Sequence, residues 1–408
     1  MTDTRRAGLA FALGCLFFAY AFALRVSPSV MVEELMREFN AGAAILGNLS
    51  AFYFYAYAGL QIPVGLLLDR IGPRRLIIPA AGIVSMGCWL FASSDWLILG
   101  YAGRLAIGAG CAFSWAATLA LVNQWFPSRF ALLAGVSQLV AMVGAVAAQA
   151  PLAMVVQEIG WRSSMTAFAV FGLILTTALF VVVRDKKIDE GFRGPSEKIK
   201  VLKNTQTWLV AFFTLTMTAP LLALGGLWSV PFLTNTYAME RTTAAAVTSM
   251  LFLGNGLGCI ILGWWSDRIQ RRKPPMIIGA VTTTVCQMVF IYATELSVVT
   301  LGFLSLGIGL GSAALVVAFA CGREHNTSRN VGLTIGIINT ATTGSGAVFQ
   351  PAVGWLLDMR WRGKIIDGTR LYEPETFQLA LTILPVTSFV GLLFVLLIKE
   401  TYARVQQE

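Results

Sequence analysis

The sequence predicts an all-α membrane protein with twelve transmembrane helices, arranged as two pseudo-symmetric six-helix bundles. Of its 408 residues, 56% are hydrophobic and only 12% are charged, whereas a soluble domain has about 25% charged residues. A water-soluble fold of this length could not bury so much apolar surface, so lipid must be the solvent for much of the chain. A pattern that occurs once in each half indicates an internal duplication.

The apolar segments are long enough to cross a bilayer, which takes about 20 residues per helix. They are expected at 8–31, 43–68, 76–93, 96–120, 131–156, 163–183, 208–233, 243–266, 275–293, 297–320, 331–356 and 376–398. Each is expected to be a helix, because backbone polar groups in lipid must be satisfied within the segment. The longest polar connector follows the sixth segment. We therefore expect an N-terminal bundle at 1–183, a cytoplasmic central loop at 184–206 and a C-terminal bundle at 207–408.

The repeated pattern is a basic hairpin after the second apolar segment of each half. The first copy, GLLLDRIGPRR, contains Gly65, Asp69, Arg70, Gly72, Arg74 and Arg75. The second copy, GWWSDRIQRRK, contains Asp267, Arg268 and Arg272. The two aspartates are 198 residues apart, and IGAGCA at 107–112 is echoed by IGLGSA at 308–313. Because the order of segments is preserved, the halves should be related by an axis along the membrane normal.

The basic residues indicate orientation in the membrane rather than a nucleic-acid partner. The net charge is +9, but the Lys and Arg residues lie in short loops between apolar segments. Loops on the N-terminal side carry 21 of the 30, and loops on the opposite side carry 7. The positive-inside rule therefore places both termini in the cytoplasm, and we expect an integral protein of the bacterial inner membrane.

The residues expected of an enzyme are absent from the apolar segments. The six cysteines form no closely spaced pair, and the single histidine has no partner at metal-ligand spacing, so neither a disulfide nor a metal site is expected. No nucleophile with a base and no nucleotide-binding loop occurs at membrane depth. We therefore expect no enzymatic activity and no cofactor.

The first hairpin resembles the signature that the major facilitator superfamily carries between helices two and three. Arg104 with Gly108 and Gly110 is similar to the helix-four motif of the family, and Gly160-Trp161-Arg162 is typical of the residues before helix six. The second hairpin departs from the pattern, with Gln270 where the family prefers glycine. The resemblance covers essentially the whole chain. It implies the fold of the family, rocker-type alternating access and action as a single polypeptide, that is, as a monomer.

The two hairpins are the expected gates. A carboxylate at Asp69 can meet a helix N-terminus and arginines across the interface between the halves, so it would hold one access state closed. Gly65 would permit the close approach of two helices, and Gly72 would make the tight turn. The alternative is that the arginines of the hairpin serve only as topology anchors.

Arg25 and Arg104 are the sharpest indications of function, since a guanidinium in the bilayer costs at least about 2.5–3.5 kcal/mol on insertion scales. Both are expected about 9–12 Å below the outer surface, where no acidic residue lies; Glu33 and Glu34 are the nearest. The missing counter-charge is then the substrate, and a planar guanidinium suits a carboxylate or a phosphate. The stretch YAFALRVSPS at 20–29 is also similar to organic-anion symporters of the superfamily, whose helix-one arginine contacts a substrate carboxylate.

Each of the two arginines also has a structural interpretation. Arg25 could extend to the outer membrane interface, because long basic side chains reach the headgroups from within a helix. Arg104 could donate hydrogen bonds to the carbonyls of helix one.

Seven further residues in apolar helices are candidates to line a substrate cavity. They are Tyr53, Tyr57, Gln138, Trp228, Asn255, Asn339 and Gln350. For the aromatic residues the alternative role is packing, and for the amides it is hydrogen bonding between helices.

These observations predict a secondary active or facilitative transporter of a small organic anion or zwitterion, such as an organic acid, an amino acid or a short peptide, working in uptake. Its partners would be this substrate, the lipid bilayer and a coupling proton, carried by Glu33, Glu34 or the substrate carboxylate. One alternative is a proton-coupled multidrug or metabolite exporter of the same fold, which is disfavoured because helix five contains GAVAAQAP instead of the GPxxGG of drug exporters. A non-transporting membrane receptor is the alternative from a different class.

Overall fold

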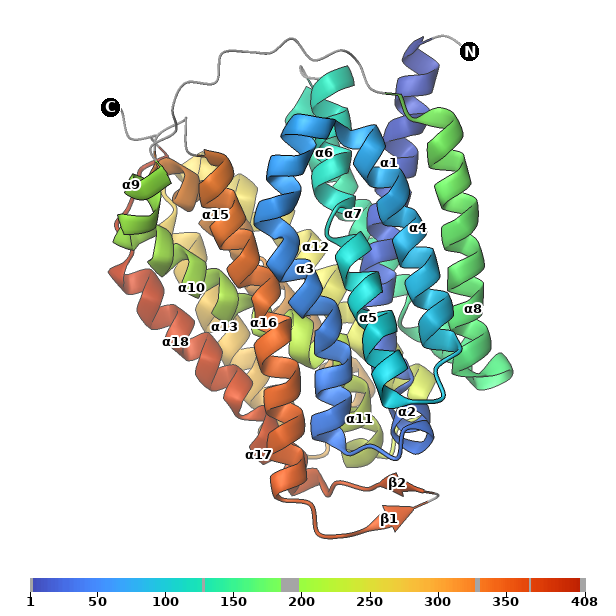
Figure 1. The fold of residues 1–408 in the computed structure, drawn as a ribbon. Helices are drawn as coiled ribbons and strands as arrows, with labels where there is room; N and C mark the ends of the chain where they lie inside the picture. Colours follow the sequence, from blue (N-terminus) through green and yellow to red (C-terminus); the bar gives the residue numbers. More distant parts are fainter. Residues whose placement is uncertain (1–2, 127–128, 185–197, 327–330, 367, 404–408) are drawn as a thin grey trace. The chain divides into compact units, whose positions relative to one another are not determined.

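The computed structural model describes residues 3–126, 129–184, 198–326, 331–366 and 368–403. Most of the expected central loop, 185–197, lies outside these ranges. The described residues are almost entirely helical, and their strands are the two-residue β1 (Ile365–Ile366) and β2 (Thr369–Arg370), which pair antiparallel. Figure 1 shows these elements along the chain.

The helices of the first half follow one another with short connections. They are α1 (Asp3–Val26), the 3-10 helix η1 (Ser27–Val30), α2 (Val32–Glu38), α3 (Ala43–Ile71), α4 (Pro73–Ala92), α5 (Leu97–Cys111), α6 (Ser114–Trp125), α7 (Phe130–Ala147) and α8 (Ala150–Val182).

The second half begins with a short helix and contains one π-helix. Its helices are α9 (Lys198–Lys203), α10 (Thr205–Ala219), the π-helix η3 (Pro220–Trp228), α11 (Ser229–Tyr237), α12 (Arg241–Ile269), α13 (Lys273–Tyr292), α14 (Val298–Ser312), α15 (Leu315–Glu324), α16 (Val331–Met359), α17 (Pro374–Leu381) and α18 (Ile383–Leu397).

The helical segments match the twelve predicted spans. Nine helical runs of the described residues are each long and apolar enough to cross a membrane. Two more spans are α3 and α16, with 29 residues each, or about 44 Å at 1.5 Å per residue. The twelfth is α7 continued by the first turns of α8. Gly160 has φ 80° and ψ 162° and so breaks α8, which separates the fifth span from the sixth.

The chain forms two compact units. Unit 1 comprises Met1–Ser27 and Phe52–Gly194, and unit 2 comprises Pro28–Ala51 and Pro195–Glu408. Within unit 1, α4 packs along α5 and α8, and α1 packs along α7; within unit 2, α12 packs along α14 and α10 along α16. The segment 28–51 belongs to the first half by sequence but packs with the second half, and the first turns of α3 lie in it.

Two glycines at equivalent positions of the repeat let helices touch backbone to backbone. A Cβ atom added at Gly108 on α5 would lie 2.1 Å from the carbonyl oxygen of Tyr53 on α3. A Cβ atom added at Gly309 on α14 would lie 2.0 Å from the carbonyl oxygen of Leu251 on α12. Any larger residue would force these helices apart, so both glycines determine how deeply their helices pack.

The two hairpins turn with different residues in the left-handed region. Gly72 adopts φ 86° before α4, and Gln270 adopts φ 52° and ψ 37° after α12. A residue with a Cβ atom is disfavoured there by about 1–2 kcal/mol. The Gln270 side chain offsets part of this cost, because its Nε2 donates to the carbonyl oxygen of Asp267 over 2.6 Å.

The substitution Gln270→Gly should stabilise the protein by about 1 kcal/mol, because glycine adopts the left-handed conformation without a Cβ clash. The thermal unfolding midpoint in detergent measures the effect. Gln378→Gly, inside α17, is the matched control and should destabilise the protein, since glycine weakens a helix interior. Equal losses of stability in both variants would show that the turn carries no strain.

Candidate functional site

The end of α1 is shaped by Pro28. Proline has no backbone N–H, so the carbonyl oxygen of Leu24, four residues earlier, loses its α-helical partner. The α-helix stops at Val26 and continues as η1. Ser27 Oγ lies 3.2 Å from the Leu24 oxygen, and Nη1 of Arg104 donates to the same oxygen over 2.9 Å. Two side chains, Ser27 and Arg104 from α5, therefore replace the hydrogen bond that proline removed.

Arg104 has the structural role that the sequence left open for it. Its side chain is fully buried, and an unsatisfied carbonyl in lipid costs several kcal/mol. The bond to Leu24 fixes the guanidinium against α1, and its Cζ atom lies 5.2 Å from the ring centre of Tyr53.

Arg25 lies inside a group of aromatic rings. Its Cζ atom is 4.2 Å from the ring centre of Phe22 and 4.8 Å from that of Tyr57. The Tyr53 ring centre lies 5.6 Å away. Such contacts are attractive because the ring faces carry negative charge, and they strengthen when desolvated. Arg25 is only 5% exposed, so it does not extend to the membrane interface, which was the alternative for this residue.

The hydrogen-bonding capacity of Arg25 is not used up. Its Nε atom is buried and has no hydrogen-bond partner in the described part of the chain. The nearest acids in sequence, Glu33 and Glu34, both bind Arg241 instead. Because the Tyr53 ring also faces Arg104, two guanidinium groups share one ring. The result is a buried, positively charged site.

The structure brings four of the predicted site residues together in unit 1: Arg25, Arg104, Tyr53 and Tyr57, here called the arginine–tyrosine group. The two tyrosine rings stack with centres 5.8 Å apart, and the Tyr53 hydroxyl donates to the carbonyl oxygen of Ala21 over 3.3 Å. They are four residues apart on α3 and so share a face.

Neither Tyr55 nor Gln138 belongs to this group. Tyr55 points away from the arginine–tyrosine group and is 42% exposed. Gln138 lies half-buried on α7.

A second set of predicted residues meets at the π-helix of unit 2. The Nε1 atom of Trp228 donates to the carbonyl oxygen of Gln350 over 3.0 Å. The Nε2 atom of Gln350 donates to the carbonyl oxygen of Leu222, inside η3, over 2.7 Å. The Gln350 Oε1 atom is buried without a hydrogen-bond partner among the described residues. The wide turns of π-helices often occur at functional sites, and no sequence pattern indicated this one.

The remaining predicted amides do not join that pair. Asn255 is buried on α12 and its Nδ2 atom donates to Ser312 Oγ over 3.1 Å, which is the helix-to-helix bonding considered as its alternative. Asn339 lies half-buried on α16.

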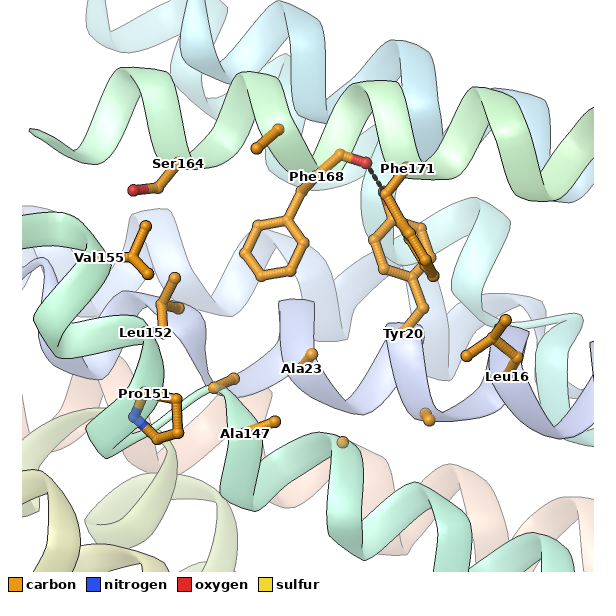
Figure 2. A pocket seen from close by; sticks show the side chains of 14 residues that line it. Leu16, Tyr20, Ala23, Ala147, Pro151, Leu152, Val155, Ser164, Phe168 and Phe171 are labelled. Carbon is orange, nitrogen blue, oxygen red and sulfur yellow. Dashed lines mark hydrogen bonds between the residues drawn. The ribbon is translucent and has the colours of Figure 1, made fainter. Parts of the chain in front are cut away.

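An apolar cavity of about 430 Å³ lies between α1, α7 and α8 of unit 1. Figure 2 shows its lining of alanine, leucine and phenylalanine side chains, among them Ala23, Leu152 and Phe168. Its two hydroxyl groups are already bonded, because Tyr20 donates to Phe168 and Ser164 donates to Gly160. This cavity therefore offers nothing to an anion.

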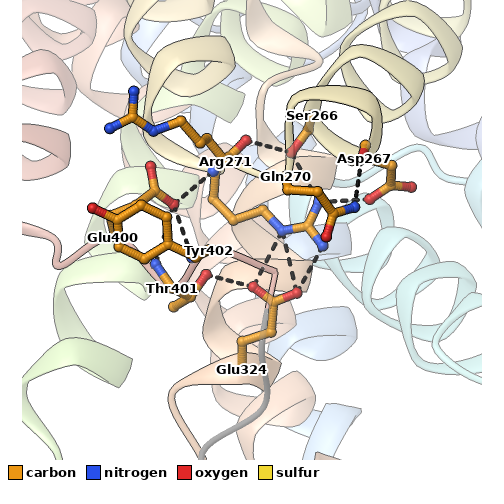
Figure 3. A network of polar contacts seen from close by, with 9 residues as sticks. Ser266, Asp267, Gln270, Arg271, Glu324, Glu400, Thr401 and Tyr402 are labelled. Atoms are coloured by element: carbon orange, nitrogen blue, oxygen red, sulfur yellow. Dashed lines mark hydrogen bonds and ion pairs between the residues drawn. The ribbon is translucent and has the colours of Figure 1, made fainter.

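The second hairpin forms a network of charges within unit 2 (Figure 3). Arg272 binds Asp267 over 2.6 Å and Glu324 over 2.7 Å, and the Glu324 carboxylate is only 2% exposed. Burial alone would lower the pKa of Arg272, but the hydrogen bonds from its guanidinium to both carboxylates raise it above its ordinary value. Arg268 points outward, 5.6 Å from the ring centre of Trp264.

The chain after α18 completes this network. Glu400 accepts the backbone N–H groups of Arg272 and Lys273 over 2.7 and 3.0 Å, at the N-terminus of α13. Burial opposes ionisation, but these hydrogen bonds hold the pKa of Glu400 below its ordinary value. Sequence reasoning missed both Glu324 and Glu400, because neither belongs to the hairpin motif.

The first hairpin is described in part. The Asp69 side chain lies outside the described residues. A Cβ atom added at Gly65 meets nothing among the described residues within 4 Å, and the close approach of helices expected there stays a prediction. Arg74 donates to the carbonyl oxygen of Phe180 over 3.4 Å, while Arg70 and Arg75 are exposed.

The segment 28–51 is joined to the second half at the start of α3. Asp358, near the end of α16, accepts the backbone N–H groups of Ala43 over 3.2 Å and of Ala44 over 2.9 Å. A carboxylate at a helix N-terminus is stabilising, because the unpaired N–H groups carry partial positive charge. Tyr372 and Arg370 both donate to the same carboxylate. We call these five residues the α3–α16 junction.

Further contacts support this junction. A Cβ atom added at Gly354 would lie 2.2 Å from the carbonyl oxygen of Ala43, so the two helix backbones are in contact. Arg241, the first residue of α12, binds Glu33 over 3.1 Å and also binds Glu34. No local sequence motif predicts that Arg241 pairs with Glu33 and Glu34, because these residues lie more than 200 positions apart in sequence.

Comparison with known proteins identifies the family to which the chain is similar along nearly its whole length. The family model described as Major Facilitator Superfamily matches residues 12–229 and again 223–407. The gentisate transporter of Corynebacterium glutamicum is 26% identical over 346 residues, which cover 80% of this chain and 75% of that protein. The "Probable L-galactonate transporter" of Escherichia coli strain K12 is 22% identical over 419 residues, covering 94% and 88%.

A solved structure with the same fold is a bacterial homologue of the human lysosomal transporter Spinster in an inward-facing, occupied conformation. It matches with a TM-score of 0.79 at 14% identity, covering 98% of this chain and 97% of that chain. At this identity the likeness concerns the fold alone.

A double-mutant cycle can test whether Arg104 donates to the Leu24 carbonyl that Pro28 leaves without a backbone donor. Arg104→Met leaves the buried Leu24 carbonyl without its charged donor and should cost about 1–3 kcal/mol of stability. Pro28→Ala restores a backbone N–H donor to the same oxygen. The loss caused by Arg104→Met should therefore shrink by at least half in the Pro28→Ala background, as read from thermal unfolding. Additive effects of the two substitutions would refute the shared carbonyl.

Proposed function

We propose that this chain, a member of the major facilitator superfamily of membrane transporters, takes up a small organic anion or zwitterion by alternating access. The chain is a multi-pass membrane transporter and not an enzyme. The observation that carries the proposal is Arg25, a buried guanidinium whose Nε atom has no partner among the described residues.

A carboxylate of the substrate supplies what Arg25 lacks. The guanidinium presents donors in a planar fork that matches the two oxygens of a carboxylate. The rings of Phe22 and Tyr57 fix its orientation at 4.2 and 4.8 Å, so little side-chain freedom is lost when the anion binds. Arg104 acts on the substrate through its field and by holding α1, since its Nη1 atom is bound to the Leu24 carbonyl.

The relatives support an organic acid as the substrate. Two of the relatives are named for gentisate and L-galactonate, and both compounds are carboxylates. Trp228 and Gln350, which meet at the π-helix, are the proposed contacts of the second half, together with Asn255 and Asn339. Gln138 on α7 is a further proposed contact of the first half.

Two sets of contacts are the proposed gates. The α3–α16 junction and the Arg241 pairs with Glu33 and Glu34 close the outer side in one access state. The two hairpins, around Asp69 and Asp267, close the cytoplasmic side in the other. The bundles 1–183 and 207–408 rock between these states, both termini face the cytoplasm, and the monomer is the working unit.

A coupling proton fits the outer gate. The Glu33 and Glu34 carboxylates both face Arg241. Protonation of these carboxylates would therefore remove the ion pairs between the segment 28–51 and α12. Binding of a proton from outside would thereby favour the state in which the substrate enters.

Arg25→Ala should raise the KM for uptake of an organic acid about 30-fold or more, because truncating one partner of a buried charge pair costs 2–5 kcal/mol. Arg25→Lys should restore part of the loss, since it keeps the charge without the fork. Uptake of radiolabelled gentisate, other carboxylic acids and amino acids into proteoliposomes measures the effect. Tyr55→Phe, on the exposed face of α3, is the control and should transport normally.

Near-normal flux in folded Arg25→Ala protein would remove Arg25 from the site. Accumulation of lipophilic cations by the wild-type protein, without flux of any organic acid, would replace the proposal by the exporter.

Asp358→Asn should shift the protein toward the outward-open state, because the neutral amide no longer stabilises the N-terminus of α3. A loss of about 1–2 kcal/mol changes the ratio of states roughly 5- to 30-fold. Spin labels at Glu38 and Glu375, both exposed in unit 2, report the change as a larger population of long distances.

The matched control is Asp95→Asn, which loses an exposed ion pair with Arg162 in unit 1. It should leave the distance distribution unchanged. An Asp358→Asn distribution identical to that of the wild type would reject the gate.

A further inference from the structure

A cavity rich in arginine lies at one end of unit 1, lined by residues other than the proposed substrate contacts. Its volume is about 520 Å³. It is lined by Arg74, Arg75, Ile78, Pro79, Phe180 and Arg184. Half of these residues are arginines, and none of the described lining residues is acidic.

The cavity lies at the boundary of the bilayer. It is formed by the first turns of α4 and the last turns of α8, and both helices cross the membrane. The flank of α8 is apolar and exposed at this level, as expected of a surface that meets lipid, since Phe180 and Val181 are 60% and 62% exposed. A ligand here has cations on its water side and apolar side chains on its hydrocarbon side.

Arginines already hold this end of α8 in place. Arg6 donates from Nε to the carbonyl oxygen of Val182 over 3.1 Å and from Nη2 to that of Val181 over 3.0 Å. Arg74 donates to the Phe180 oxygen, and its Cζ atom lies 6.0 Å from the Phe180 ring centre. These bonds satisfy the last carbonyls of the helix and position the Arg74 fork at the cavity wall. Arg75 and Arg184 are exposed beside it.

We propose that this cavity binds the phosphate headgroup of an anionic phospholipid in the leaflet on the N-terminal side. Arginine forks match phosphate oxygens in pairs, and basic pockets between membrane helices suit anionic headgroups. Ile78, Pro79 and Phe180 cover the glycerol end of the lipid, and the acyl chains continue along the exposed flank of α8. The apolar part of the lining favours a lipid over free phosphate.

The test is a thermal-shift titration of the purified full-length protein in detergent. The probes are dioleoylphosphatidylglycerol, dioleoylphosphatidylcholine and inorganic phosphate. The anionic lipid should stabilise the wild-type protein at about tenfold lower concentration than the zwitterionic lipid, and phosphate should give no shift. Equal shifts from both lipids, or the same shift from phosphate, would overturn the proposal.

Variants locate the site. Arg75→Gln with Arg184→Gln should abolish the preference for the anionic lipid, and Arg75→Lys with Arg184→Lys should retain most of it. Arg268→Gln with Arg323→Gln removes the same charge from exposed positions in unit 2 and should keep the full preference. Loss of the preference in this control pair would show that the preference does not depend on this cavity. Persistence of the preference after Arg75→Gln with Arg184→Gln would show that the lipid does not bind there. Native mass spectrometry of lipid adducts gives the same readout if a variant is too unstable for the titration.

Discussion

The carbonyl oxygen of Leu24 fixes the position of the buried Arg104 in unit 1. Pro28 removes its backbone donor at membrane depth, where no water can replace it. The Ser27 hydroxyl and the buried Arg104 donate to it over 3.2 and 2.9 Å, and α5 can come this close to α3 because Gly108 has no side chain. Tyr53 then lies between the two guanidinium groups, and Arg25 is confined among rings beside it. One missing N–H group thus accounts for the bond that holds Arg104 against α1.

The duplicated halves share the same close backbone contact between helices but differ in charge. Gly108 meets Tyr53 in the first half, and Gly309 meets Leu251 in the second at almost the same distance. At the repeat position of Arg104, the second half has the buried Ser305. The two halves therefore share this helix packing, while among the described residues the paired buried arginines occur in the first half. Such an asymmetry is what a carrier of a small anion needs, because one strong contact at one end of the substrate defines its orientation.

Hydropathy predicted every span, because lipid leaves the backbone no alternative to a helix. The cost of a charge in the bilayer singled out Arg25 and Arg104, and a spacing of four residues placed Tyr53 and Tyr57 on one face. The contacts of Asp358 with Ala43 could not be predicted, since they join residues 315 apart in sequence without a local pattern. The π-helix was missed for a related reason: it depends on packing that residue type alone does not encode.

The most direct measurement of the central claim compares a transported acid with its own carboxamide as inhibitors of uptake in proteoliposomes. The two compounds have nearly the same shape, but only the acid supplies the negative charge that the buried guanidinium lacks. The account predicts that the acid inhibits at a concentration about 30-fold or more below that of the amide. Equal inhibition by the two compounds would show that the positive site does not recognise its cargo by charge.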